Sequence, residues 1–164
     1  MARRPSDDSS SAWIGRLYDR FAPALYRYAV MVLADPAAAS DVVQQVFVAL
    51  LRRRRDEVAD DERYLRRAVR NECFSALRRR QREASREAPL LEPIAPFENV
   101  DVRLTIERVL RALSPEQREV VHLKVYEAMT FQEIADLTGE PLNTVASRYR
   151  YALDKLRARL EAKR

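Results

Sequence analysis

Apolar residues recur at intervals of three and four through most of the chain, which is the spacing of amphipathic helices. One such stretch runs from Ser11 to Leu33, where Pro23 predicts a break or kink and Trp13 and Tyr18 are candidate core residues. A second follows Asp35-Pro36, which pairs an N-cap residue with proline at the first helical position. Its apolar positions are Ala39, Val42, Val43, Val46, Phe47, Leu50 and Leu51.

A third helix is predicted from the acidic residues Asp60, Asp61 and Glu62 to about Arg82. One of its faces is apolar and contains Leu65, Ala68, Val69, Cys73 and Ala76. Prolines then punctuate residues 84–100, a density that excludes a helix and favours an extended linker. We therefore predict a first domain over 1–83, a linker over 84–100 and a second domain over 101–164.

The second domain is predicted to contain four helices, the first over 101–113. Ser114-Pro115-Glu116-Gln117 has the form of a capping box and opens a helix to about Glu127. Thr130 and Glu133 form a second box, which opens a short helix that ends near Gly139. A long last helix follows from about Asn143. The last two helices have the proportions of a helix-turn-helix.

Composition supports an all-α fold of two small domains. Glycine occurs only twice, and hydrophobic residues make up 47% of the chain, so helices with a buried core are favoured over sandwiches and barrels. One cysteine and one histidine exclude an intrachain disulfide, a cysteine cage and a two-histidine zinc site. We expect no metal, no cofactor and no enzymatic activity. The chain has no signal-peptide pattern and no apolar run near 20 residues, so we expect a cytoplasmic protein without membrane insertion.

Positive charge is concentrated in one predicted helix. Residues 63–82 hold eight arginines and one glutamate, a local net charge of +7 in a chain of net charge +5. Arg63, Arg66, Arg67, Arg70 and Arg78 cluster opposite the apolar face with Phe74 among them, and Tyr64 and Asn71 lie at the edge. Arginines beside an aromatic ring suit phosphates and unstacked bases. The alternative is a solvated basic face that is partly paired with Asp60, Asp61 and Glu62.

The last helix presents a second candidate surface for DNA. Its apolar stripe is predicted to contain Val145, Tyr149, Ala152, Leu153, Leu156 and Leu160. Short polar side chains and arginine lie on the far side, a set that suits base edges and phosphates in a major groove. The members of this set are Asn143, Thr144, Ser147, Arg150, Tyr151 and Asp154. An amphipathic helix with a solvated face is the alternative.

Several segments together resemble the extracytoplasmic-function sigma factors, the small two-domain type of bacterial sigma factor. The resemblance covers nearly all of Tyr18 to Leu160 and keeps the family's order. Its segments are ASDVVQQVF (39–47), YLRRAVRN (64–71), ALRRR (76–80), LSPEQREV (113–120), EIA (133–135) and TVASR (144–148). The chain departs from the family's usual residues at Ser40, Tyr64, Ser75, Ala128 and Ala146, where an acidic residue, Trp, Asp, Gly and Lys respectively are common.

The resemblance implies roles that periodicity does not show. It implies that Asp41, Gln44, Gln45 and Phe47 bind the β′ clamp of core RNA polymerase. It implies that the −10 promoter element is engaged by Tyr64, Arg66, Arg67, Arg70, Asn71, Phe74, Arg78 and Arg79. It implies that the −35 element is read by Asn143, Thr144, Ser147, Arg148, Arg150 and Tyr151, in a domain that rests on the β flap.

The resemblance also implies an anti-sigma partner.

Two other functions are possible on the sequence alone. A stand-alone helix-turn-helix regulator would need a dimer seam for paired half-sites, and the chain shows no sustained heptad pattern. We therefore expect a monomer when the protein is free. An enzyme would need a catalytic set, and none is apparent in the sequence.

Overall fold

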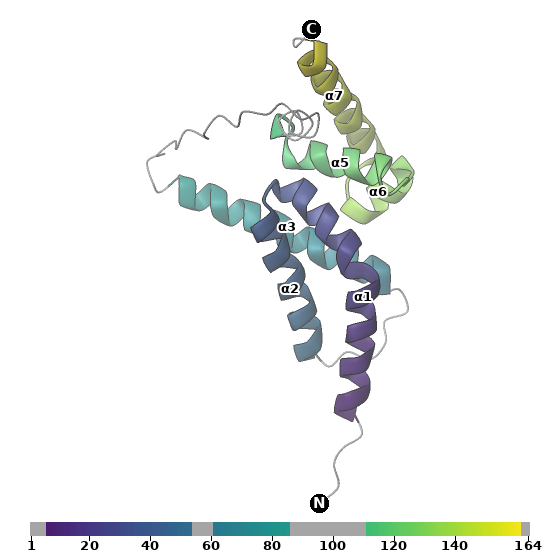
Figure 1. The fold of residues 1–164 in the computed structure, drawn as a ribbon. Coiled ribbons are helices and arrows are strands. Elements are labelled where there is room, and N and C mark those ends of the chain that lie inside the picture. The colour runs from purple at the N-terminus through teal and green to yellow at the C-terminus, as the bar shows by residue number, and fades with distance from the viewer. Residues whose placement is uncertain (1–5, 54–60, 86–110, 162–164) are drawn as a thin grey trace, which may run out of the picture. The chain divides into compact units, whose positions relative to one another are not determined.

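The computed structural model describes residues 6–53, 61–85 and 111–161, and the regular structure in those ranges is entirely helical. The helices are α1 (Ser6–Leu33), α2 (Pro36–Arg53), α3 (Asp61–Ala84), α5 (Pro115–Val125), α6 (Phe131–Thr138) and α7 (Leu142–Glu161) (Figure 1). The all-α prediction is confirmed. None of the helices in the described ranges combines the length and hydropathy that a bilayer-spanning segment requires.

The chain divides into two compact units, Met1–Leu77 and Arg78–Arg164. The division falls within α3, a few residues before the predicted end of the first domain at residue 83. Most of the predicted linker (84–100) and most of the predicted helix 101–113 lie outside the described residues.

The first unit is built on the packing of α1 against α2 (Figure 1). The chain reverses between them at Ala34, which has a left-handed φ of 53°. The Oδ1 atom of Asp35 then accepts the backbone N–H of Ala38 at 2.9 Å, so the predicted N-cap of α2 is confirmed. Both helices bury an apolar stripe that includes Trp13, Leu17, Leu25, Val32, Val42, Val46, Phe47 and Leu50.

Of the break or kink predicted at Pro23, the break is wrong, because α1 continues through it and begins at Ser6. Proline removes one helical hydrogen bond and crowds the preceding turn, at a cost of about 3 kcal/mol. Burial of one large apolar side chain returns about 1.5–3 kcal/mol, and α1 buries several. Tyr18 is a second correction, since it is 45% exposed rather than a core residue. Leu51 on α2 is also 45% exposed.

One face of α3 belongs to the core of the first unit. Leu65, Val69 and Cys73 recur every four residues and are completely buried, as the sequence pattern predicts. Burial of this face leaves the arginines of α3 toward the surface.

The second unit contains α5, α6 and α7, and the capping boxes predicted at the start of α5 and of α6 are confirmed. In the first, the hydroxyl of Ser114 accepts the N–H of Gln117, whose side chain accepts the N–H of Ser114. Thr130 and Glu133 repeat the arrangement at α6. The helix-turn-helix follows, with Gly139 in the left-handed region at φ 73°, where a side chain would be strained.

The core of this unit contains Leu113, Val121 and Ala152, with Tyr149 and Leu156 packed against it. Val145 is also buried. Four positions of the predicted stripe of α7 are therefore confirmed: Val145, Tyr149, Ala152 and Leu156. Leu153 and Leu160 are not part of the core, since they are 37% and 53% exposed. The stripe is narrower than predicted because α5 and α6 cover only one side of α7.

Candidate functional site

The arginine-rich side of α3 combines cations with aromatic rings. The guanidinium of Arg70 lies over the ring of Phe74, with 4.8 Å between the guanidinium carbon and the ring centroid. Arg66 and Tyr64 are half-buried, whereas Arg67 and Asn71 are exposed. Near Tyr64 and Phe74 the surface therefore offers both charge and a π face, the two features that bind single-stranded nucleic acid.

Part of the charge on this side is balanced within the helix. Arg66 donates to Oε1 of Glu62 from Nη2 at 2.9 Å and from Nε at 3.1 Å. The pair is solvent-accessible, so its net contribution to stability is about 0–1 kcal/mol. An incoming phosphate can therefore replace the carboxylate at little cost. Arg78 and Arg79 follow on the exposed C-terminal end of α3.

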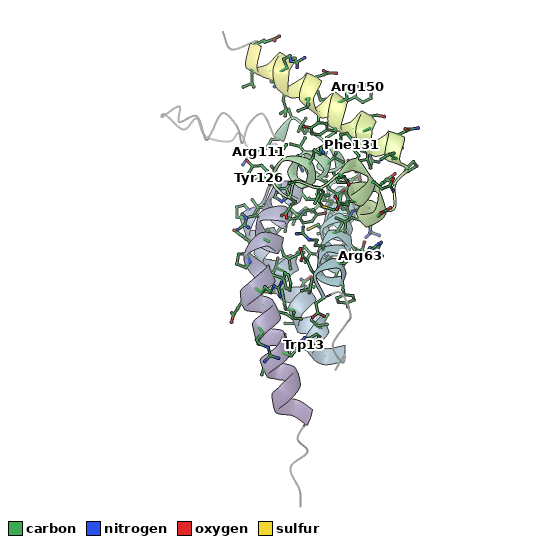
Figure 2. All side chains as sticks on the ribbon, turned by 90° about the vertical axis from the view of Figure 1, so that its right-hand side faces the viewer. Trp13, Arg63, Arg111, Tyr126, Phe131 and Arg150 are labelled. Carbon is green, nitrogen blue, oxygen red and sulfur yellow. The ribbon has the colours of Figure 1, made fainter. Side chains whose placement is uncertain are left out.

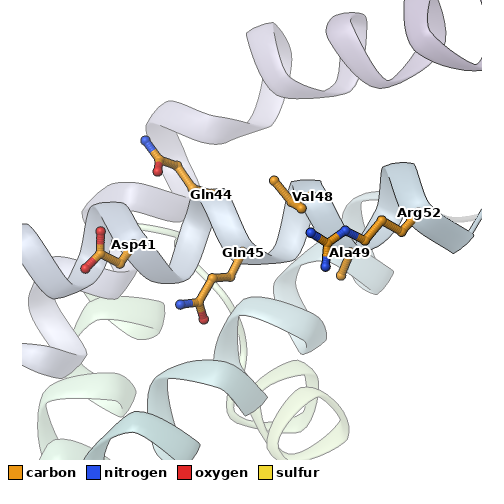
Figure 3. A pocket seen from close by; sticks show the side chains of 6 residues that line it. All are labelled: Asp41, Gln44, Gln45, Val48, Ala49 and Arg52. Carbon is orange, nitrogen blue, oxygen red and sulfur yellow. The ribbon is translucent and has the colours of Figure 1, made fainter.

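An open hollow lies along one side of α2. It is lined by Asp41, Gln44, Gln45, Val48, Ala49 and Arg52 (Figure 3). The structure thus brings the three predicted polar residues together on one exposed surface. Sequence reasoning missed Val48, which is 42% exposed, and Arg52. The helical repeat could have found them, since Val48 follows Gln44 by four residues and Arg52 follows Val48 by four.

Phe47 is not part of that surface. Its side chain is only 4% exposed, and its ring meets Tyr18 of α1 edge-on with the centroids 5.0 Å apart. Aromatic rings prefer this perpendicular arrangement. Phe47 therefore fixes α2 against α1 and supports the hollow from beneath.

The N-terminal half of α7 presents a polar, cationic surface. Asn143, Arg150 and Tyr151 are exposed, and Thr144 and Ser147 are half-buried beside them. The guanidinium of Arg150 lies 5.2 Å from the ring centroid of Tyr151, and Figure 2 shows Arg150 on α7. The hydroxyl of Ser147 donates to the carbonyl of Asn143. These residues share one side of the helix, as predicted.

Arg148 behaves differently from its neighbours on α7. Its Nη2 atom donates to Oε1 of Glu140 at 3.1 Å, across the turn that joins α6 to α7. The two side chains are 26% and 33% exposed. A residue predicted to contact DNA is therefore held by a carboxylate of the same domain.

Two buried polar side chains of α5, Arg118 and His122, contact groups of the same domain. Arg118 donates to the carbonyl of Leu113 at 2.8 Å, and burial lowers the pKa of its guanidinium. The Nε2 atom of His122 lies 3.4 Å from Oε1 of Glu127, and the imidazole stacks on Tyr126. No group of three or more histidine, cysteine, aspartate or glutamate side chains in the described ranges could hold a metal ion.

Both halves of the chain match models of one protein family. Residues 17–83 match Sigma-70 region 2, and residues 109–158 match Sigma-70, region 4. The chain is also 33% identical to the ECF RNA polymerase sigma factor SigL of Mycobacterium tuberculosis, over 98% of this chain and 97% of that protein. The chain belongs to the ECF sigma factors. It binds core RNA polymerase and directs promoter-specific initiation, as sigma factors do.

The region 2 match excludes the alternative of a stand-alone helix-turn-helix regulator, which would leave the first unit without a function. Further relatives support the assignment. The RNA polymerase sigma-E factor of Streptomyces coelicolor is 35% identical over 149 residues, which cover 85% of this chain and 81% of that protein. Sigma factors as a family direct the polymerase and are not themselves enzymes.

Solved structures support the fold of this sigma factor. The sigma factor RpoE of Bartonella quintana, crystallised with the anti-sigma factor NepR, aligns with a TM-score of 0.72 at 24% identity. The alignment covers 92% of this chain and 98% of RpoE. CnrH, solved with the cytosolic domain of CnrY, aligns with a TM-score of 0.66 at 24% identity over 97% of this chain and 94% of CnrH.

Proposed function

We propose that this sigma factor divides promoter recognition among three surfaces of its own. The α2 hollow binds the β′ clamp of core polymerase, the arginine side of α3 engages the −10 element, and the start of α7 reads the −35 element. The observation that supports this division is that the described helices carry two separate cationic surfaces of different chemistry. One combines arginines with aromatic rings, and the other combines arginine with short polar side chains.

The α2 hollow suits a protein partner more than it suits DNA. It contains both a carboxylate and a guanidinium, Asp41 and Arg52, and it exposes the apolar side chain of Val48. Mixed polar and apolar surfaces of this kind are typical of protein interfaces. Asp41, Gln44, Gln45 and Val48 would contact the clamp directly. Phe47 would act from beneath by holding α2 in place.

The α3 surface suits a melted −10 element. Arg66, Arg67 and Arg70 would neutralise phosphates, Asn71 would supply an amide to base edges, and Tyr64 and Phe74 would stack on displaced bases. Arg78 and Arg79 extend the positive charge along the same helix. Arg66 would exchange its pairing with Glu62 for a phosphate.

The α7 surface suits duplex DNA in the major groove. Asn143, Thr144, Ser147 and Tyr151 offer donors, acceptors and apolar surface to base edges, and Arg148 and Arg150 would contact phosphates. One helix-turn-helix reads one half-site, so a monomer is sufficient when the polymerase supplies the rest of the affinity.

The remaining features of the proposal follow from membership of the family. The region 2 and region 4 domains would comprise residues 1–83 and 101–164, with 84–100 as the linker and the second domain resting on the β flap. The protein would act in the cytoplasm, where bacterial transcription takes place, and would catalyse no covalent step itself. An anti-sigma partner would hold it inactive, in the manner of the relatives crystallised with such partners.

Run-off transcription tests the proposal. Purified core polymerase from the same organism is assayed on a promoter library with and without the protein, and co-elution of protein and core is measured in parallel. We expect transcripts that depend on the protein and share upstream motifs. Val48→Asp should abolish co-elution while leaving the melting temperature unchanged, because Val48 lies on the surface and is not part of the core. Leu160→Asp, an exposed apolar residue near the end of α7, is the matched control. Co-elution that survives Val48→Asp would contradict the placement of the docking surface.

A further inference from the structure

The ion pair between Arg148 and Glu140 lies at the margin of the surface proposed to read DNA. At 100° per residue, the middle of that surface is formed by Asn143, Ser147, Arg150 and Asp154. Arg148 lies on its flank beside Thr144. An arginine side chain is long enough to reach either the DNA or the turn from such a position. In this structure it reaches the turn, where Nη2 meets Glu140 at 3.1 Å.

Glu140 is well placed to compete with DNA for Arg148. A carboxylate and a phosphate present the same kind of acceptor to a guanidinium. Both partners are partly solvent-exposed, at 26% and 33%. A phosphate can therefore take the place of the carboxylate, but only by breaking this ion pair. The new contact then contributes less to DNA affinity than it would if Arg148 had no partner in the free protein.

We propose that Glu140 is a negative determinant of promoter binding, which competes with DNA phosphate for Arg148 and lowers affinity for any duplex. This inference rests on the proposed role of α7 in reading DNA. Non-specific binding is almost wholly electrostatic, so masking one cation at the margin suppresses it. Contacts to base edges made by the centre of the surface are unaffected. Glu140 thus weakens the general electrostatic attraction to DNA and leaves base reading unchanged.

The test compares holoenzymes reconstituted from core polymerase and the full-length sigma chain. Binding is measured on a promoter fragment that the wild-type holoenzyme transcribes and on a scrambled duplex of equal length, at several salt concentrations. Glu140→Gln removes the charge and keeps the size. Glu161→Gln, at the far end of α7, removes an equal charge away from the surface. Arg148→Ala and the double variant Glu140→Gln/Arg148→Ala complete a double-mutant cycle, which measures the coupling between the two residues.

We expect Glu140→Gln to raise affinity for both duplexes by about two- to fivefold, with a salt dependence steeper by up to about one unit. Glu161→Gln should match wild type, and the double variant should match Arg148→Ala, because Glu140 acts through Arg148. Unchanged or weaker binding by Glu140→Gln would overturn the inference. A gain that persists without Arg148, or that Glu161→Gln shares, would also overturn it.

Asn143→Ala and Arg150→Ala separate this inference from the proposed function. If both variants weaken promoter binding while Glu140→Gln changes nothing, only the role of Glu140 is wrong. If both bind as wild type does, the proposed DNA surface of α7 is wrong, and the role of Glu140 fails with it.

Discussion

Lys155 of α7 donates a hydrogen bond to Oε1 of Gln117 at 3.3 Å, across 38 residues of sequence. The same oxygen accepts the backbone N–H of Ser114 at 3.1 Å and so closes the capping box of α5. One side-chain amide therefore serves both the start of α5 and its attachment to α7. The Gln117 side chain, which the sequence predicts as part of a cap, thus also helps to hold α7 against α5.

This shared role predicts unequal effects at the two ends of the contact. Gln117→Ala removes the side-chain half of the capping box and the contact with Lys155, and should lower the free energy of unfolding by about 1 kcal/mol. Lys155→Met removes only an exposed contact, and should cost less than about 0.5 kcal/mol. Urea unfolding of the full chain measures both. Equal losses would show that the amide does not act mainly as a cap.

Ala128 predicts a stabilising substitution. It has a left-handed φ of 53°, at a position where glycine is common in the family that the chain resembles. This conformation costs a residue with a Cβ atom about 1–2 kcal/mol of conformational free energy, a cost that glycine does not have. Ala128→Gly should therefore raise the free energy of unfolding by about 0.5–1 kcal/mol, after the extra entropy of the unfolded chain is deducted.

Ala146→Gly is the matched control for that substitution. Ala146 lies inside α7, where glycine should instead cost about 1 kcal/mol. Opposite signs for the two variants in the same urea experiment would confirm the strain at Ala128. A loss of stability in both would refute it.

Glu133 predicts an acid-sensitive start to α6. Its carboxylate accepts the backbone N–H of Thr130 at 2.7 Å and the hydroxyl of the same residue at 2.8 Å, and these bonds lower its pKa. Because the folded pKa is the lower one, the stabilisation is present above the ordinary glutamate pKa of about 4.3. It is lost as the pH falls through the lowered value.

Thermal unfolding of wild type and Glu133→Gln from neutral to acidic pH measures this effect. The wild type should melt at the higher temperature near neutral pH, and the difference should disappear in acid. A difference that does not change with pH would mean that the ionised form of Glu133 contributes nothing to the cap.

The arginine side of α3 predicts a defect in promoter opening. Arg66→Ala combined with Arg70→Ala removes two cations, one of which is the guanidinium over Phe74, and should slow formation of the open complex by roughly tenfold or more. Core binding should be unchanged. Arg157→Ala combined with Arg159→Ala removes the same charge from the end of α7 as a control. Permanganate reactivity of unpaired thymines follows opening directly, and wild-type rates would contradict this placement.

The sequence alone determined the features that depend on neighbours along the chain. Both capping boxes, the N-cap at Asp35 and the turn at Gly139 rest on hydrogen bonds within four residues, so the residue types and spacings predict them. The buried set of α3 follows from the helical period in the same way. The three polar residues of the α2 hollow and the polar side of α7 were also predictable, because a regular helix fixes which positions share a side.

Only the tertiary structure decided which periodic positions are covered and which charged groups meet. Tyr18, Leu51, Leu153 and Leu160 fit apolar stripes yet are exposed, because a neighbouring helix covers only part of each stripe. Phe47 lies beneath the surface that its motif implied, and α1 continues through Pro23 because packing outweighs a lost hydrogen bond. The contacts of Arg148 with Glu140 and of Lys155 with Gln117 depend on how the chain folds back on itself. Helical periodicity describes one helix at a time and contains no information on contacts between side chains of different elements.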